Sequence, residues 1–121
     1  MSYAWNQMSS ALETAIFDKA REIAKAHDIP EHVASFGPVS TKPKFSSVTF
    51  GLTTMVQFRR AMDRSNELSM ADKVDEHEAA VVKAAIESTQ TSLKLSQQLS
   101  STKLPKPVLE AVVAASAALV L

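Results

Sequence analysis

The side chains best suited to metal binding near the first helix lie on either side of a proline. Two histidines, His27 and His32, flank the carboxylates of Asp28 and Glu31. The five-residue spacing across Pro30 matches neither a helical histidine pair nor a known loop template for a metal ion. Helix capping and surface solvation explain this stretch better than a metal site does.

The densest acidic run covers residues 72–78 and includes His77. A di-metal carboxylate bundle needs inward-facing glutamates together with Glu-x-x-His pairs on more than one helix. No Glu-x-x-His pattern occurs anywhere in the chain. We therefore expect the run to be a solvated part of a helix, and we predict no metal site.

Nucleophilic and phosphate-transfer chemistry is also disfavoured by the sequence. A serine nucleophile needs a sharp turn flanked by glycine and a histidine partner, yet no Gly-x-Ser-x-Gly occurs. With only two glycines, the chain has no phosphate-binding glycine loop, and with no cysteine it has no thiolate chemistry. The sequence predicts a non-enzymatic protein with no catalytic residue and no cofactor.

One basic segment could bind an anionic partner. It combines five cations with three phenylalanines: Lys42, Lys44, Arg59, Arg60 and Arg64 with Phe45, Phe50 and Phe58. Such a mixture can bind single-stranded nucleic acid through phosphate contacts and base stacking. However, the phenylalanines occupy core-like positions, and a chain of zero net charge lacks the overall basic footprint of a nucleic-acid binder. An anionic protein surface is the better-supported partner.

Length and composition predict one domain whose charge is unevenly distributed. The chain has 121 residues, 45% of them apolar, which is enough for a single core. Residues 42–64 carry five basic side chains against one acidic, whereas residues 67–87 carry six acidic against two basic. The two blocks can match each other within the chain or on neighbouring copies. No signal peptide or transmembrane segment is expected, and a cytoplasmic or intraparticle location is the default expectation.

Hydrophobic periodicity predicts an all-α protein, a small antiparallel bundle of about four helices. The expected helices cover residues 3–27, 49–66, 69–103 and 108–121, and an extended proline-containing loop covers 37–48. Residues 45–50 are the only candidate for a strand. The central helix 69–103 would be long, with Ser69 as its N-cap and Asp72 three positions later. The pattern leaves open whether the second and third helices are continuous.

Two features of this pattern indicate contacts with another helix or chain. Serines recur every four residues beside the apolar face of the central helix, at Ser88, Ser92, Ser96 and Ser100. They either bond back to their own helix or form a close-packed seam. The last helix is apolar nearly all round, including Val112, Val113, Leu119, Val120 and Leu121. Such a helix is buried, either in its own bundle or against a partner.

These observations favour a helical structural or assembly protein that packs against copies of itself or within a larger complex. Small subunits of filaments, capsids and secretion rods share this kind of pattern, which is a likeness of class only. Two alternatives remain open. One is a small helical adaptor or regulator that binds a different protein, and the other is nucleic-acid binding through residues 42–64.

Overall fold

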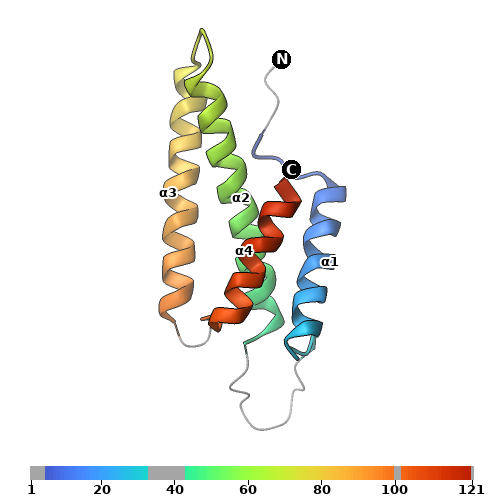
Figure 1. Cartoon of the computed structure of the whole chain (residues 1–121). Coiled ribbons are helices and arrows are strands. Elements are labelled where there is room, and N and C mark those ends of the chain that lie inside the picture. Colours follow the sequence, from blue (N-terminus) through green and yellow to red (C-terminus); the bar gives the residue numbers. More distant parts are fainter. Residues whose placement is uncertain (1–4, 33–42, 100–101, 121) are drawn as a thin grey trace.

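The computed structural model describes residues 5–32, 43–99 and 102–120. Across these ranges the chain forms four helices, which are α1 (Ser10–Ala26), α2 (Phe45–Ser69), α3 (Glu76–Gln98) and α4 (Lys106–Val120). Successive helices run in opposite directions, and α2 is central, with α3 on one side and α1 and α4 on the other (Figure 1). The predicted small antiparallel helical bundle is confirmed.

The first helix begins later than predicted, at Ser10 rather than near residue 3. The side-chain oxygen of Ser9 accepts a hydrogen bond from the backbone N–H of Leu12 at 3.1 Å. This bond satisfies a donor that the first turn of a helix otherwise leaves unpaired. The serine therefore sets the start of α1.

The end of α1 is closed by a reversed turn at Asp28, which has a φ of 61°. The backbone N–H of Ile29 donates to the carbonyl of Ala24 at 2.8 Å, and that of Asp28 donates to Lys25 at 3.5 Å. Together with the left-handed backbone conformation of Asp28, these two bonds form a Schellman motif. The turn directs Ile29 into the core, where it is buried.

The second helix starts at Phe45, earlier than predicted. Residues 45–48, expected to be loop, and residues 45–50, considered as a strand, are therefore helical. Positions 37–42 of the predicted loop lie outside the described residues. Because Phe45 and Val48 are buried, the first turn of α2 is part of the core.

The long helix expected over residues 69–103 is divided, and only residues 76–98 form α3. Ser69 ends α2 instead of capping the next helix, and its hydroxyl donates to the carbonyl of Asn66 at 2.7 Å. The true N-cap is Asp75, whose Oδ1 accepts from the backbone N–H groups of His77 and Glu78 at 2.9 and 3.2 Å. The break lets α3 fold back along α2.

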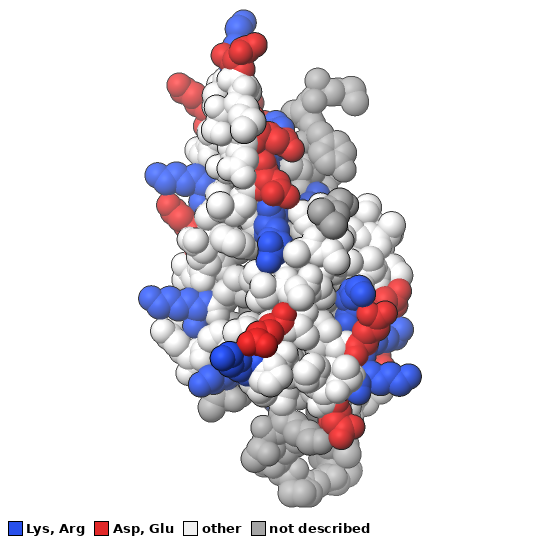
Figure 2. All heavy atoms as spheres, viewed as in Figure 1, with Lys and Arg blue, Asp and Glu red and all other residues white. Residues whose placement is uncertain are grey.

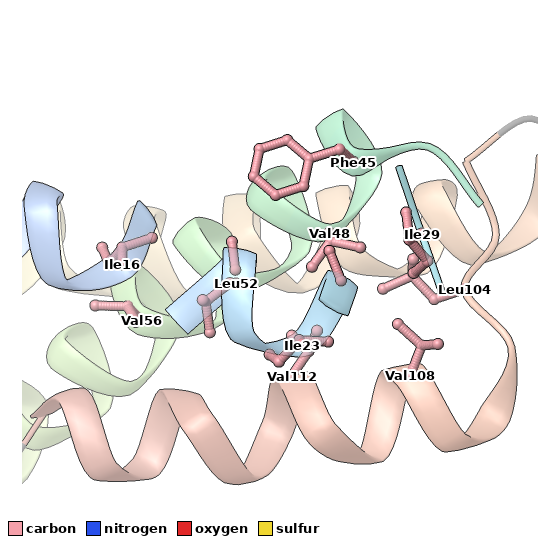
Figure 3. Close-up of a cluster of buried hydrophobic side chains, with 12 residues drawn as sticks. Ile16, Ile23, Ile29, Phe45, Val48, Leu52, Val56, Leu104, Val108 and Val112 are labelled. Atoms are coloured by element: carbon pink, nitrogen blue, oxygen red, sulfur yellow. The ribbon is translucent and has the colours of Figure 1, made fainter. Parts of the chain in front are cut away.

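The main core lies between α1, α2 and α4, and none of its residues comes from α3. Figure 3 shows side chains of the three helices meeting there, including Ile16, Ile23, Leu52, Val56, Val108 and Val112. Gly51 permits this close packing, because a Cβ there would lie 3.3 Å from Cδ1 of Leu104. The α1–α2–α4 unit is therefore the packed centre of the molecule.

Helix α3 packs on α2 and contacts neither α1 nor α4 through its backbone. Its buried residues recur every seven positions, at Val82, Thr89 and Ser96, so they form the side that faces α2. Thr89 donates its hydroxyl to the carbonyl of Ala85, and Ser96 donates to that of Leu93, both at 2.8 Å. Because both hydroxyls bond to carbonyls of α3 itself, they can face α2 without needing a hydrogen-bond partner on that helix.

Candidate interaction surface

Several of the polar residues considered for metal binding have structural roles. Among the residues that the structure describes, no three His, Asp or Glu side chains are placed to hold a metal ion. His27 is the C-cap of α1, and Asp28 forms the reversed turn after it. In the acidic run, Asp75 caps α3, and Glu78 binds an arginine of α2.

The three arginines of the predicted basic patch bind three different parts of the chain. Arg59 donates through Nε to Oγ of Ser116 in α4 at 2.8 Å. Arg60 donates through Nη2 to the carbonyl of Gln7 at 2.8 Å. Arg64 donates to α3 and, through Nη1, to Glu67 at 2.7 Å. Of the two lysines, Lys44 is exposed before α2, and Lys42 lies outside the described residues. Much of the hydrogen-bonding capacity of these arginines is therefore used inside the molecule.

The pairing of Arg64 with Glu78 joins α2 to the first turn of α3. Arg64 Nε lies 2.6 Å from Oε1 of Glu78, and Nη2 lies 3.0 Å from Oε2, so both carboxylate oxygens are bound. These hydrogen bonds hold the pKa of Glu78 below its usual range and raise the pKa of Arg64. Both groups are thus fixed in their charged forms.

Charged side chains of both signs are interspersed over the face that carries α4, with uncharged surface between them (Figure 2). Such a mixture gives no broad field of one sign, which a phosphate backbone would need for strong binding. Lys and Arg side chains form no single continuous patch in the view of Figure 2.

The terminal helix α4 has one buried side and one exposed side, although its sequence is apolar nearly all round. Val112 and Ser116 are fully buried, while Val113, Leu119 and Val120 are half-buried. Its exposed residues are Lys106, Pro107, Glu110 and three alanines, Ala114, Ala117 and Ala118. Leu121 lies outside the described residues. Much of the predicted contact surface of this helix is therefore covered by its own bundle.

Of the four predicted serines, Ser100 lies outside the described residues, and the other three differ in exposure. Ser96 is buried against α2, Ser92 is half-buried, and Ser88 is exposed. The two more exposed serines lie on a stripe of side chains that are exposed or half-buried. We call this stripe the α3 outer face, and it consists of Val81, Ala85, Ser88, Ser92, Leu95 and Leu99.

The α3 outer face exposes large apolar side chains. The exposed fraction is 37% for Val81, 54% for Leu95 and 59% for Leu99. On a helical wheel the charged residues of this helix segment, Lys83, Glu87 and Lys94, fall away from the stripe. A hollow of about 230 Å³ adjoins the upper part of the face, lined by Trp5, Asn6, Gln57, Arg60, Ala85, Ser88 and Thr89. The face is uncharged along its whole length.

Sequence reasoning did not single out Val81, Leu95 and Leu99 as interaction residues. Sequence reasoning considered only the serines beside the apolar face of the central helix. A usable signal was present, because the six positions alternate by four and three residues, as in a heptad repeat. The sequence could not show that α3 meets only one neighbour.

None of the helices within the described residues is long and apolar enough to cross a membrane. Comparison with protein-family models, curated proteins and solved structures gives no match to this chain.

Proposed function

We propose that this protein is a non-enzymatic helical subunit that assembles with copies of itself. The observation that carries the proposal is the position of α3 at the edge of the molecule, where α2 is the only helix whose backbone it contacts among the described residues. Its outer face exposes Leu95 and Leu99, and none of the six residues of this face is charged. An exposed apolar stripe of this kind is a common mark of a protein contact surface.

The arrangement of the two packed units supports the same proposal. The α1–α2–α4 core is complete without α3, so α3 can present one side to a partner while the other side holds to α2. Small residues on the α3 outer face, such as Ala85 and Ser92, allow a second helix to approach closely. The exposed residues of α4 include two charged side chains and three alanines but no large apolar side chain, which makes it the weaker of the two candidate surfaces.

The experiment is the mass of the protein in solution, measured by light scattering after size exclusion from about 1 μM to about 1 mM, the range of weak protein dimers. We expect the mass to rise with concentration. The double substitution Leu95→Lys with Leu99→Lys should keep the protein monomeric, because association would bury two charges.

A matched control adds the same charge to the other side of α3 through Gln90→Lys and Gln98→Lys. It should associate like the parent chain. Circular dichroism on each variant checks that the helices remain folded. A parent chain that stays monomeric at every concentration would overturn the proposal and direct attention to a foreign protein partner.

A further inference from the structure

The α3 outer face has the spacing of a coiled-coil seam. Its members stand at positions 81, 85, 88, 92, 95 and 99, so the intervals alternate between four and three residues. This alternation keeps the stripe on one side of a helix and is the a/d pattern through which two helices pack knobs into holes. Leu99, the C-cap residue, closes the stripe.

The stripe is symmetric about the level of Gln90. A second copy running in the opposite direction would place Ser88 against Ser92, Ala85 against Leu95, and Val81 against Leu99. Each of these three layers joins an a position to a d position, as antiparallel pairing requires. In the central layer, Ser88 and Ser92 are both small, and in the next layer Leu95 meets the small side chain of Ala85. The two helices can therefore approach closely near the axis.

The charges at the two ends of α3 favour the same direction. Its N-terminal end carries the N-cap Asp75 and the acidic first-turn residues Glu76 and Glu78, of which Glu78 is paired with Arg64, while the chain after its last turn is basic, with Lys103 and Lys106. Antiparallel copies bring the acidic end of one helix level with the basic end of the other, and they also oppose the two helix dipoles. Parallel copies would bring two acidic ends together.

We infer that two copies of this chain associate through their α3 outer faces as an antiparallel, two-fold pair with the axis at the level of Gln90. This inference rests on the proposed self-assembly and specifies its geometry. The seam from Val81 to Leu99 is about 27 Å long at about 1.5 Å per residue. A single helix pair of that length buries an area at the lower end of the range for specific interfaces, so the pair forms reversibly and depends on concentration.

The test uses disulfide formation, because the chain contains no cysteine of its own. Two variants, Ser88→Cys and Ser92→Cys, are made, one with an affinity tag so that products differ in mass. They are mixed at high concentration and oxidised mildly, and the products are separated by mass. We expect the mixed 88–92 disulfide to form fastest and to dominate.

The geometric reason for this expectation is the offset along the helix axis. In the inferred pair, position 88 lies directly opposite position 92 of the other copy. Two copies of position 88 are displaced by four residues, or about 6 Å, which moves the Cα atoms beyond the separation that a disulfide can span. A Gln90→Cys variant on the other side of α3 supplies the rate of random crosslinking.

The three possible crosslinking results distinguish the geometry of the pair from self-assembly itself. Dominance of the mixed disulfide supports the antiparallel pair. Fast formation of 88–88 and 92–92 disulfides in a protein that does associate would overturn this geometry and leave self-assembly standing. Crosslinks that form in the proportions of random mixing, at the rate of Gln90→Cys and with a monomeric mass, would overturn the proposed self-assembly as well.

Discussion

Arg64 of α2 donates hydrogen bonds to both carboxylate oxygens of Glu78 in α3, with Nε 2.6 Å from Oε1 and Nη2 3.0 Å from Oε2. Glu78 follows Asp75 by three positions in the first turn of α3. A glutamate at this position can turn back to the N-cap residue in a capping box. Here its carboxylate instead binds the neighbouring helix, and this bidentate pair fixes the register of the α2–α3 hairpin.

The first prediction concerns the pH dependence of this pair. The arginine lowers the pKa of Glu78 in the folded protein, so the unfolded state binds more protons in the interval below the usual carboxyl pKa of about 4.3. The stabilisation from Glu78 is complete above that value and is lost as the pH falls through the lowered pKa. We therefore expect the stability difference between the parent chain and Glu78→Gln to shrink on acidification.

Urea unfolding of both proteins between neutral and acidic pH measures this difference. Glu87→Gln removes a charge from the other side of the same helix and serves as the control. A difference that stays constant, or grows, on acidification would contradict the assignment of the ion pair.

The second prediction identifies the start of α3. Because the carboxylate of Asp75 accepts two backbone N–H bonds, Asp75→Ala should lower the free energy of unfolding by about 1 kcal/mol. Asp72→Ala, in the turn before the helix, should change it by less than about 0.5 kcal/mol. Equal losses in the two variants, measured by urea unfolding, would mean that α3 begins earlier than described.

The third prediction concerns the reversed turn after α1. Asp28 has a φ of 61°, a conformation that costs a residue with a Cβ about 1 kcal/mol relative to glycine. Both Asp28→Gly and Asp28→Ala remove the aspartate side chain, so their difference isolates the backbone term. We expect the glycine variant to be more stable than the alanine variant by about 1 kcal/mol. Thermal unfolding of the pair is the measurement, and equal melting temperatures would refute the left-handed turn.

The fourth prediction tests the close approach at Gly51. A methyl group there would lie 3.3 Å from Cδ1 of Leu104 and 3.8 Å from Cγ1 of Val112. Gly51→Ala gains about 1 kcal/mol of helix propensity, which offsets a small shift of the Leu104 side chain, so we expect a nearly neutral change. Gly51→Leu should destabilise by about 1–3 kcal/mol through overpacking. A leucine variant as stable as the parent would show that α4 lies farther from α2.

Much of the helical pattern could be predicted from the sequence because it depends on local chemistry. Apolar residues at helical spacing indicate α1 and α4, and two prolines, Pro105 and Pro107, mark the start of the last helix. The burial of Val112 could also be predicted from the sequence, because a helix that is apolar nearly all round is expected to pack into a core. The helix ends were less predictable, because several polar residues near each end can cap.

The break between α2 and α3 shows this limit. The spacing from Ser69 to Asp72 and that from Asp75 to Glu78 both fit a capping pattern. The sequence alone gives them similar standing. The fold selects the second, because Glu78 can reach Arg64 only when the chain reverses before Asp75.

The sequence by itself determined that this chain is a helical bundle, since hydrophobic periodicity and proline positions act within single helices. Only the tertiary structure decided which side of α3 stays uncovered. The sequence of α3 contains an apolar stripe, but its burial depends on how many helices pack against it, and α2 is the only helix whose backbone contacts α3 among the described residues. For that reason Val82 is buried while Leu95, equally apolar, is left exposed.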